Sequence, residues 1–489
     1  MKLFRKIPFF LFLLALFFCL HGSVENFGFI RFTEVLYPGM YIVTGILLLT
    51  GFIFLFTRNL LHASLIAFFI SLWYLFFGAL HDYVKSTAAL ALLKAYPVII
   101  TVLLLLTFAW ILLLKFKKSL HGRLAAYINI LLLIYCLLDI FMLLKIQLTK
   151  SDEPFADTVK FNKAAVTQKP DVYLLVFDGY PGPKSLKDSF NFTNDSLKQH
   201  LTANAFKELP VFANYDLTYF CMASMFNMQY VKKDFEDLHI TQRDFQKRGV
   251  EINRAAIFPI FISMGYQVNN FSIFEIDDLP PVSDKNSFLL AHSILLTDKI
   301  FHKRLKRDLG NHLARIIPFW KNNDFYQHDA DNKRTEALLI QSFTEKKQSP
   351  QFVYAHFMMP HGPYYFDSLG NKNPYEKIMN YTMWQDKTLF LAYLKYVNKR
   401  MMNMVDSIVR HNPGAIILVM GDHGFRSFNS RQPDQPLRFD NLCMARFPNG
   451  NYAAMKDKWS NVNLFRYLFN SQFGQSMPYL ADSSFTLRY

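Results

Sequence analysis

The first third of the chain consists of long apolar stretches separated by short polar loops. Five such stretches precede residue 150, at positions 8–20, 37–56, 60–80, 95–114 and 124–144. A membrane-spanning helix needs about 20 apolar residues, and the last four stretches supply them. The first is shorter and follows a basic start, so a cleaved signal peptide is the alternative. Because no small-residue cleavage site follows Leu20 and four spans come after it, we favour a retained helix and five crossings.

The charged residues of the loops predict an orientation. Lysines and arginines gather before the first span, between the second and third, and between the fourth and fifth, whereas the other loops carry little net charge. Basic loops stay in the cytoplasm, so the N-terminus is expected there, and five crossings deliver residue 150 to the other side. We therefore expect an integral membrane protein whose large C-terminal domain is extracytoplasmic, and periplasmic in a Gram-negative cell. Asp139, inside the fifth span, either marks a substrate or proton path or makes a polar contact between helices.

Beyond residue 170 the pattern changes to that of an α/β domain. Residues 172–177, 266–274, 352–357 and 415–420 are apolar runs of strand length, and residues 253–265 and 389–410 have helical periodicity. Strands alternating with helices predict a mostly parallel sheet covered by helices. The predicted domains are five transmembrane helices in 1–146, a polar linker in 147–170 and an extracytoplasmic domain in 171–489.

Polar side chains follow three of these predicted strands. Asp178 follows the first run, Asp422 and His423 follow the last, and His361 lies just past the third. Ligands of α/β sheets bind beyond the carboxyl ends of the strands, so these groups are expected to converge. Each taken singly is equally explained as a turn or a capping residue. Together they predict a site for one divalent metal, with oxygen and nitrogen ligands that suit zinc or manganese, while magnesium and calcium remain alternatives.

Composition excludes other classes of protein. The net charge is +15, but much of the excess lies in loops between apolar stretches, which argues against nucleic-acid binding. The four cysteines form no zinc motif, and the sequence leaves open whether Cys221 pairs with Cys443. The oligomeric state is not predicted.

Three motifs resemble the alkaline phosphatase superfamily, in its sulfatase-like branch. They are the run ending in Asp178-Gly179, the segment Pro360-His361-Gly362-Pro363-Tyr364, and Gly421-Asp422-His423-Gly424. Several spans before such a domain resemble the architecture of lipoteichoic acid synthases and lipid A phosphoethanolamine transferases. The resemblance covers the chain from about residue 170 to its end, including Asn441 and Arg446.

The resemblance implies a nucleophile at the start of a helix, and Thr218 takes that position. A hydroxyl beside a dication and a helix N-terminus loses its proton more readily; the alternative makes Thr218 a helix N-cap. Formylglycine sulfatases need an arginine four residues after the modified residue, but positions 222 and 225 are both Met. The resemblance therefore favours a threonine nucleophile acting on phosphorus.

The implied metal ligands are Asp178, Thr218, Asp422 and His423. His361 would protonate the leaving group or bind phosphate. His356, a residue of the strand itself, is expected in the core or behind the ligands, and His356 and Arg426 are further candidates for binding substrate. The implied reaction moves a phosphoglycerol or phosphoethanolamine headgroup from a membrane lipid to an envelope acceptor such as a glycan. A membrane-anchored hydrolase of phosphate or sulfate esters and an inactive scaffold are the alternatives.

Overall fold

The computed structural model forms two compact units. It describes residues 2–27, 30, 32–149, 160–231, 239–277, 279–282, 293–316, 327–345, 348–378, 386–426, 436–453, 455 and 457–488. The helical unit comprises Met1–Asp152 and Asn286–Asn322, and the sheet unit comprises Glu153–Lys285 and Asn323–Tyr489. Residues 150–159 of the predicted linker at 147–170 lie outside the described residues.

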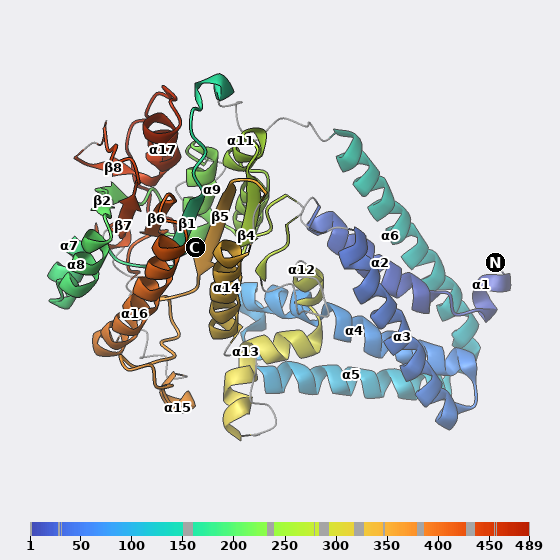
Figure 1. Ribbon diagram of the computed structural model, residues 1–489. Coiled ribbons are helices and arrows are strands. Elements are labelled where there is room, and N and C mark those ends of the chain that lie inside the picture. The colour runs from blue at the N-terminus through green and yellow to red at the C-terminus, as the bar shows by residue number, and fades with distance from the viewer. Residues whose placement is uncertain are drawn as a thin grey trace. The chain divides into compact units, whose positions relative to one another are not determined.

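The helical unit holds the apolar stretches of the sequence as long helices (Figure 1). Its helices are α1 (Lys2–Lys6), α2 (Phe10–Glu25), α3 (Phe32–Thr57), α4 (Leu60–Ser86), α5 (Tyr96–Phe116), α6 (His121–Thr149), α12 (Ser293–Thr297) and α13 (Phe301–Ile316), with 3-10 turns η1 (Ala88–Lys94) and η2 (Lys118–Leu120).

Four helices in the described part of the chain are long and apolar enough to cross a membrane. They are Glu34–Thr57, Leu60–Ser86, Tyr96–Phe116 and Lys118–Leu148. These helices indicate membrane anchoring. The first predicted span corresponds to α2, whose 16 residues reach about 24 Å at 1.5 Å per residue. That length is short of a hydrocarbon core of about 30 Å, so the fifth crossing stays a prediction.

A segment between two strands of the sheet unit belongs to the helical unit. The sequence analysis assigned all of 171–489 to one domain, whereas Asn286–Asn322 groups with the helical unit. Gly78 allows the backbones to approach closely there: its amide donates to the carbonyl oxygen of Lys299 over 2.7 Å, and a Cβ at Gly78 would lie 2.7 Å from Lys299 Cα. The buried guanidinium of Arg304 pairs with Asp82 and lies 3.5 Å from Asp308.

The sheet unit is built on six strands in the order β2-β7-β6-β1-β5-β4. The strands β6, β1, β5 and β4 run parallel, and β7 and β2 are antiparallel at one edge. The mostly parallel sheet agrees with the sequence prediction, and its four parallel strands are the four predicted apolar runs. The strands are β1 (Val172–Phe177), β2 (Lys207–Glu208), β4 (Gln267–Phe271), β5 (Gln351–Phe357), β6 (Ile416–Gly421) and β7 (Cys443–Arg446), and a separate pair joins β3 (Val211–Phe212) to β8 (Trp459–Ser460).

Helices cover both faces of this sheet (Figure 1). Val172, Leu174 and Val176 of β1 belong to one apolar core, which includes residues of α9, α11 and α17. The intervening residues of β1 belong to a second core with residues of α7, α8, α14 and α16. The helices of this unit are α7 (Pro183–Phe190), α8 (Asp195–Ala203), α9 (Thr218–Asn227), α10 (Gln242–Asn253), α11 (Ile257–Ser263), α14 (Gln327–Thr344), α15 (Tyr375–Ile378), α16 (Lys387–His411) and α17 (Leu464–Gln472), with 3-10 turns η3 (Lys163–Ala165), η9 (Pro436–Arg438) and η10 (Asn461–Asn463).

The strand register brings the ends of β1, β5 and β6 together. Phe177 lies opposite Phe357 on one side and Gly421 on the other, so Asp178 and Asp422 leave the sheet at the same level. Val176 lies opposite His356 and Met420. Since side chains alternate along a strand, His356 points to the face that carries Val176, which is the face covered by α9.

Candidate metal centre

Three buried side chains meet where β1, β5 and β6 end. Asp178, His356 and Asp422 each offer one ligand atom, and these atoms all lie within 4.8 Å of one another. His356 Nε2 is 3.9 Å from Asp178 Oδ2. Between 0 and 2% of each residue is exposed, so water contributes little to their solvation. The sequence predicts His356 in the core or behind the ligands, but its ring nitrogen lies among the candidate ligand atoms.

The polar atoms facing this space have no hydrogen-bond partner in the described part of the chain. They are Asp178 Oδ1, His356 Nε2 and Asp422 Oδ2. Leaving a buried acceptor unpaired costs about 1–3 kcal/mol, and more when it is charged. Three such atoms converging on one point therefore indicate a bound cation. Carboxylate oxygens and imidazole nitrogens suit a divalent metal.

His423 reaches the same place from the loop after β6. Its Nε2 lies 3.5 Å from Asp422 Oδ2 and 3.8 Å from Asp178 Oδ1. Its Nδ1 lies 2.8 Å from the carbonyl oxygen of Gly424. A carbonyl can only accept, so Nδ1 carries the proton and the Nε2 lone pair is directed toward the carboxylates. A backbone contact of this kind is how a metal-binding histidine is held in one tautomer.

Thr218 completes the cluster from the first turn of α9. Its Oγ1 lies 3.5 Å from Asp178 Oδ2 and 3.4 Å from His423 Nε2. The N-cap of α9 is Leu217, so the alternative in which Thr218 caps the helix does not hold. The hydroxyl instead sits at the positive end of the helix dipole, where negative charge on oxygen is stabilised.

The loops that carry these groups are fixed by buried amides and an ion pair. Asn441 Nδ2 donates to the Gly421 carbonyl over 2.6 Å, and Asn461 Nδ2 donates to the Asp422 carbonyl over 3.0 Å. In front of α9, Asp216 pairs with Arg438 at 2.8 Å. These contacts hold the ends of β6 and the start of α9 in one arrangement.

A second group of basic side chains, His361 and Arg426, lies next to Asp178. His361 donates its backbone N–H to the Asp178 carbonyl over 3.1 Å, and its Nδ1 lies 2.7 Å from the Gly362 carbonyl oxygen. Arg426 Nη2 is 3.3 Å from His361 Nε2. The guanidinium can only donate, so His361 Nε2 accepts in this arrangement. His361 and Arg426, both predicted from the sequence, thus lie together.

The charges of this group shift the pKa values in a consistent sense. Burial raises the pKa of Asp178, but the facing His361, His356 and His423 outweigh it and bring that pKa below its usual range. Burial lowers the pKa of His361, and Arg426 lowers it further, against the opposing effect of Asp178. The resting state therefore pairs an ionised Asp178 with a neutral His361.

His328, in the first turn of α14, is a residue that sequence reasoning missed. Its pKa is lowered by burial and by the neighbouring His361. It lies in a polar helical segment with no motif around it, so no sequence signal distinguished it. Cys221 is excluded as a nucleophile because its buried thiol donates to the Tyr215 carbonyl and burial raises its pKa well above the ordinary value. Cys221 and Cys443 are both free thiols.

Residues 310–465 match the family model described as Sulfatase. This stretch contains His356, His361, Asp422, His423 and Arg426, whereas Asp178 and Thr218 precede it. This part of the chain is therefore similar to the sulfatases, a class of hydrolase. No curated protein sequence matches the chain.

Solved structures of several proteins are similar to part of the chain. The C-terminal periplasmic domain of EcEptC from Escherichia coli, in complex with Zn, is 9% identical over 66% of this chain and 87% of that chain, with a TM-score of 0.39. The phosphonate monoester hydrolase of Agrobacterium radiobacter is 13% identical over 62% and 73%, with a TM-score of 0.36. A putative sulfatase from Bacteroides thetaiotaomicron is 11% identical over 65% and 74%, with a TM-score of 0.41.

Proposed function

We propose that this protein is a metal-dependent phosphotransferase that uses Thr218 to move a phospho-headgroup from a membrane lipid to an envelope acceptor. The observation that carries the proposal is the position of Thr218 Oγ1, within 3.5 Å of Asp178 and His423 at a helix N-terminus. No arginine stands where a formylglycine enzyme requires one, which favours phosphorus over sulfur. Apolar helices in the same chain favour a lipid donor.

The residues that would hold the cation are Asp178, Thr218, His356, Asp422 and His423. Their unpaired buried atoms and their oxygen and nitrogen donors fit a divalent ion, with zinc or manganese favoured by the two imidazoles. When bound, such an ion offsets negative charge on oxygen and lowers the pKa of a hydroxyl beside it. Magnesium and calcium are less well matched because both prefer sites made of oxygen alone.

The reaction would proceed in two displacements. In the first, a bond forms between Thr218 Oγ1 and phosphorus, and the bond from phosphorus to the lipid oxygen breaks; the proton that Thr218 gives up ends on that oxygen. In the second, a bond forms between an acceptor hydroxyl oxygen and phosphorus, the bond from phosphorus to Thr218 Oγ1 breaks, and the acceptor's proton ends on Thr218 Oγ1. His361, whose pKa is lowered by burial, would take up and return the proton, while Arg426, 3.3 Å from His361 Nε2, would face the phosphoryl oxygens.

The proposal includes the topology, with the N-terminus in the cytoplasm, five crossings and the sheet unit outside. The basic loops that favour this topology lie before the first apolar stretch, between the second and third, and between the fourth and fifth. Proteolysis of sealed spheroplasts should digest the sheet unit from outside and leave α1 protected. Digestion of α1 with protection of the sheet unit would reverse the topology.

Intact-protein mass spectrometry tests the nucleophile. The purified full-length protein, loaded with zinc or manganese, is incubated with vesicles of phosphatidylethanolamine or phosphatidylglycerol. A headgroup phosphate adduct that maps to Thr218 and disappears in Thr218→Ala, with metal still bound, supports the proposal. The matched control Cys221→Ala should keep the adduct. An adduct on any other residue, or none with any lipid headgroup, refutes it.

A membrane-anchored hydrolase is the second function that the site supports, because water and an acceptor hydroxyl can resolve the same adduct. Adding a soluble acceptor glycan separates the two readings. A transferase attaches the phospho-headgroup to the glycan. A hydrolase forms the free phosphate ester, and at the same rate with and without the glycan.

A further inference from the structure

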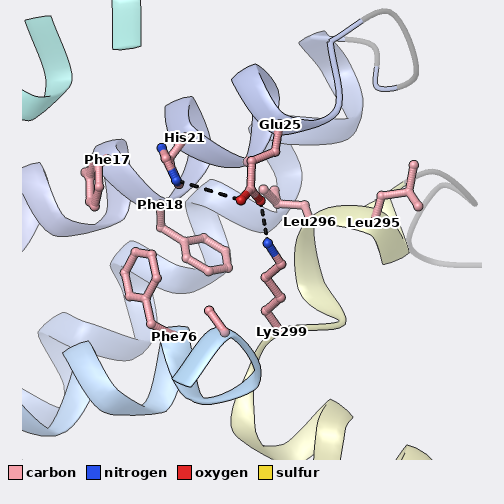
Figure 2. A pocket seen from close by; sticks show the side chains of 10 residues that line it. Phe17, Phe18, His21, Glu25, Phe76, Leu295, Leu296 and Lys299 are labelled. Carbon is pink, nitrogen blue, oxygen red and sulfur yellow. Dashed lines mark hydrogen bonds and ion pairs between the residues drawn. The ribbon is translucent and has the colours of Figure 1, made fainter. Parts of the chain in front are cut away.

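A cavity of about 290 Å³ lies within the helical unit, and none of its lining residues is among those proposed for catalysis. Its wall consists of three aromatic rings, two leucines, two small residues and three ionisable side chains (Figure 2). The lining residues are Phe17, Phe18, His21, Gly22, Glu25, Phe76, Ala79, Leu295, Leu296 and Lys299. Sites for small ligands begin at about 300 Å³. The space therefore suits a headgroup and glycerol, with acyl chains left outside.

The cavity lies at the end of the helix bundle. Glu25 is the last residue of α2, and Ala79 lies about 10 Å along the axis of α4 from its end at Ser86. The headgroup region of a bilayer begins about where apolar spans end. Leu295, Leu296 and Lys299 come from the segment inserted between β4 and β5, which supplies one part of the cavity wall.

The ionisable side chains form a chain of opposite charges, as Figure 2 shows. The Glu25 carboxylate pairs with Lys299 and lies 3.9 Å from His21 Nε2. The other ring nitrogen of His21, Nδ1, is 3.4 Å from Asp139 Oδ1. Asp139 is buried inside α6, and its Oδ2 has no hydrogen-bond partner among the described residues. His21 thus lies between two carboxylates, those of Glu25 and Asp139, and Lys299 pairs with the first of them.

We propose that this cavity binds the headgroup of a zwitterionic, ammonium-bearing phospholipid. The ammonium would lie at Glu25, on the side backed by His21 and Asp139, and the phosphate would lie at Lys299. A pair as exposed as Glu25 and Lys299 contributes little by itself, about 0–1 kcal/mol, so a ligand that satisfies both charges can open it. The rings of Phe17, Phe18 and Phe76 add favourable contacts to a cation.

An anionic headgroup fits this lining poorly. Phosphoglycerol brings a phosphate for Lys299 but nothing for Glu25, and it adds negative charge beside two carboxylates. Phosphoethanolamine and phosphocholine both combine a cationic nitrogen with a phosphate. The carboxylates favour phosphoethanolamine, whose ammonium has N–H donors, and the aromatic rings favour the quaternary ammonium of phosphocholine. The site goes beyond the proposed reaction, because binding here needs no turnover.

Native mass spectrometry of the full-length protein tests the site. The Thr218→Ala variant, which cannot form the proposed adduct, is released from nanodiscs that contain equal amounts of dioleoyl phosphatidylethanolamine, phosphatidylcholine and phosphatidylglycerol. We expect either zwitterionic lipid to be retained about tenfold over phosphatidylglycerol, equivalent to about 1.4 kcal/mol. Equal retention of all three lipids, or a preference for phosphatidylglycerol, overturns the proposal.

Three variants place the effect in the cavity. Glu25→Gln should remove the preference for zwitterionic lipid, and Ala79→Leu should reduce lipid retention by filling the space without changing charge. Lys94→Gln, an exposed cation outside the cavity, is the matched control and should leave the preference unchanged. If Glu25→Gln does not fold, Ala79→Leu alone tests the site. A folded Ala79→Leu variant that retains as much lipid as the parent, with the same preference for zwitterionic lipid, contradicts the proposal.

Discussion

The ring nitrogen Nε2 of His356, on β5, lies 3.9 Å from the carboxylate oxygen Oδ2 of Asp178, the residue that follows the neighbouring parallel strand β1. The register makes this contact inevitable, since His356 lies opposite Val176, two residues before Asp178. The other nitrogen of the ring, Nδ1, is held 2.7 Å from the Tyr354 hydroxyl. The imidazole is therefore oriented from behind, with Nε2 left to face the carboxylates.

If His356 is a ligand, its removal should weaken metal binding. We expect His356→Ala to lower the affinity for zinc or manganese by more than about tenfold, because even residues that only orient a ligand contribute tenfold to a hundredfold. Competition with a chelator, read as metal content of the purified protein, measures this. His200→Ala is the control, since His200 pairs with Asp406 elsewhere in the sheet unit. Unchanged metal affinity in His356→Ala would show that His356 is a core residue and not a ligand.

The turn after β6 should not tolerate a side chain at position 421. A Cβ on Gly421 would lie 2.4 Å from the backbone carbonyl oxygen of Tyr180. We expect Gly421→Ala to lower the free energy of unfolding by about 1–3 kcal/mol and to weaken metal binding, because the shift moves Asp422. At Gly414 a Cβ would meet nothing nearer than 4.0 Å, so Gly414→Ala should change stability by less than about 0.5 kcal/mol. Equal effects of the two substitutions in thermal melts would contradict this account.

The metal-free protein should lose stability as the pH falls. Burial lowers the pKa values of both His361 and His328, so the unfolded chain binds protons more readily than the folded one. Their contribution to stability is complete above the ordinary histidine pKa of about 6.5, and it is lost as the pH falls through the lowered values. Melts of chelated protein between about pH 7.5 and 5 should show this fall, with a shallower slope in His328→Gln. If stability falls with pH equally steeply in His328→Gln and in the parent protein, His328 does not contribute to the pH dependence of stability.

The docking of the inserted segment should depend on a small residue in α4. A Cβ at Gly78 would lie 2.7 Å from Lys299 Cα, whereas one at Gly45 in α3 would meet nothing within 4 Å. Gly78→Ala should therefore loosen the segment and speed limited proteolysis within Asn286–Asn322 several-fold. Gly45→Ala should leave the rate of cleavage unchanged. Faster cleavage in both variants would point to general loosening of the helices.

Much of the sheet unit could be predicted because its strands are buried on both faces. Continuous apolar runs such as residues 172–177 stand out in the sequence, and the acidic and basic residues that follow them mark one edge of a parallel sheet. The structure brings Asp178, Thr218, Asp422 and His423 together as the sequence suggested. Their roles in catalysis stay predictions.

His356 was harder to place because its direction depends on register. Alternation along β5 puts Phe352, Tyr354 and His356 on one face, but only pairing with β1 shows that this face also carries Asp178. His328 gave no signal, since its partners are close only in space. The grouping of Asn286–Asn322 with the helical unit was missed for a related reason: α13 reads as an ordinary amphipathic helix, and its apolar partners, such as Phe77 and Tyr96, lie far away in sequence.

The excursion of the chain between β4 and β5 bears on how this protein can be divided. A fragment that begins after α6 would lack the long apolar helices but would still contain Leu296 and Ile300, which are buried in the helical unit. Such a fragment would expose apolar side chains and tend to aggregate. A fragment in which a short flexible linker replaces residues 286–322 would not expose them. Anyone preparing the sheet unit alone should remove residues 286–322 as well as the long apolar helices.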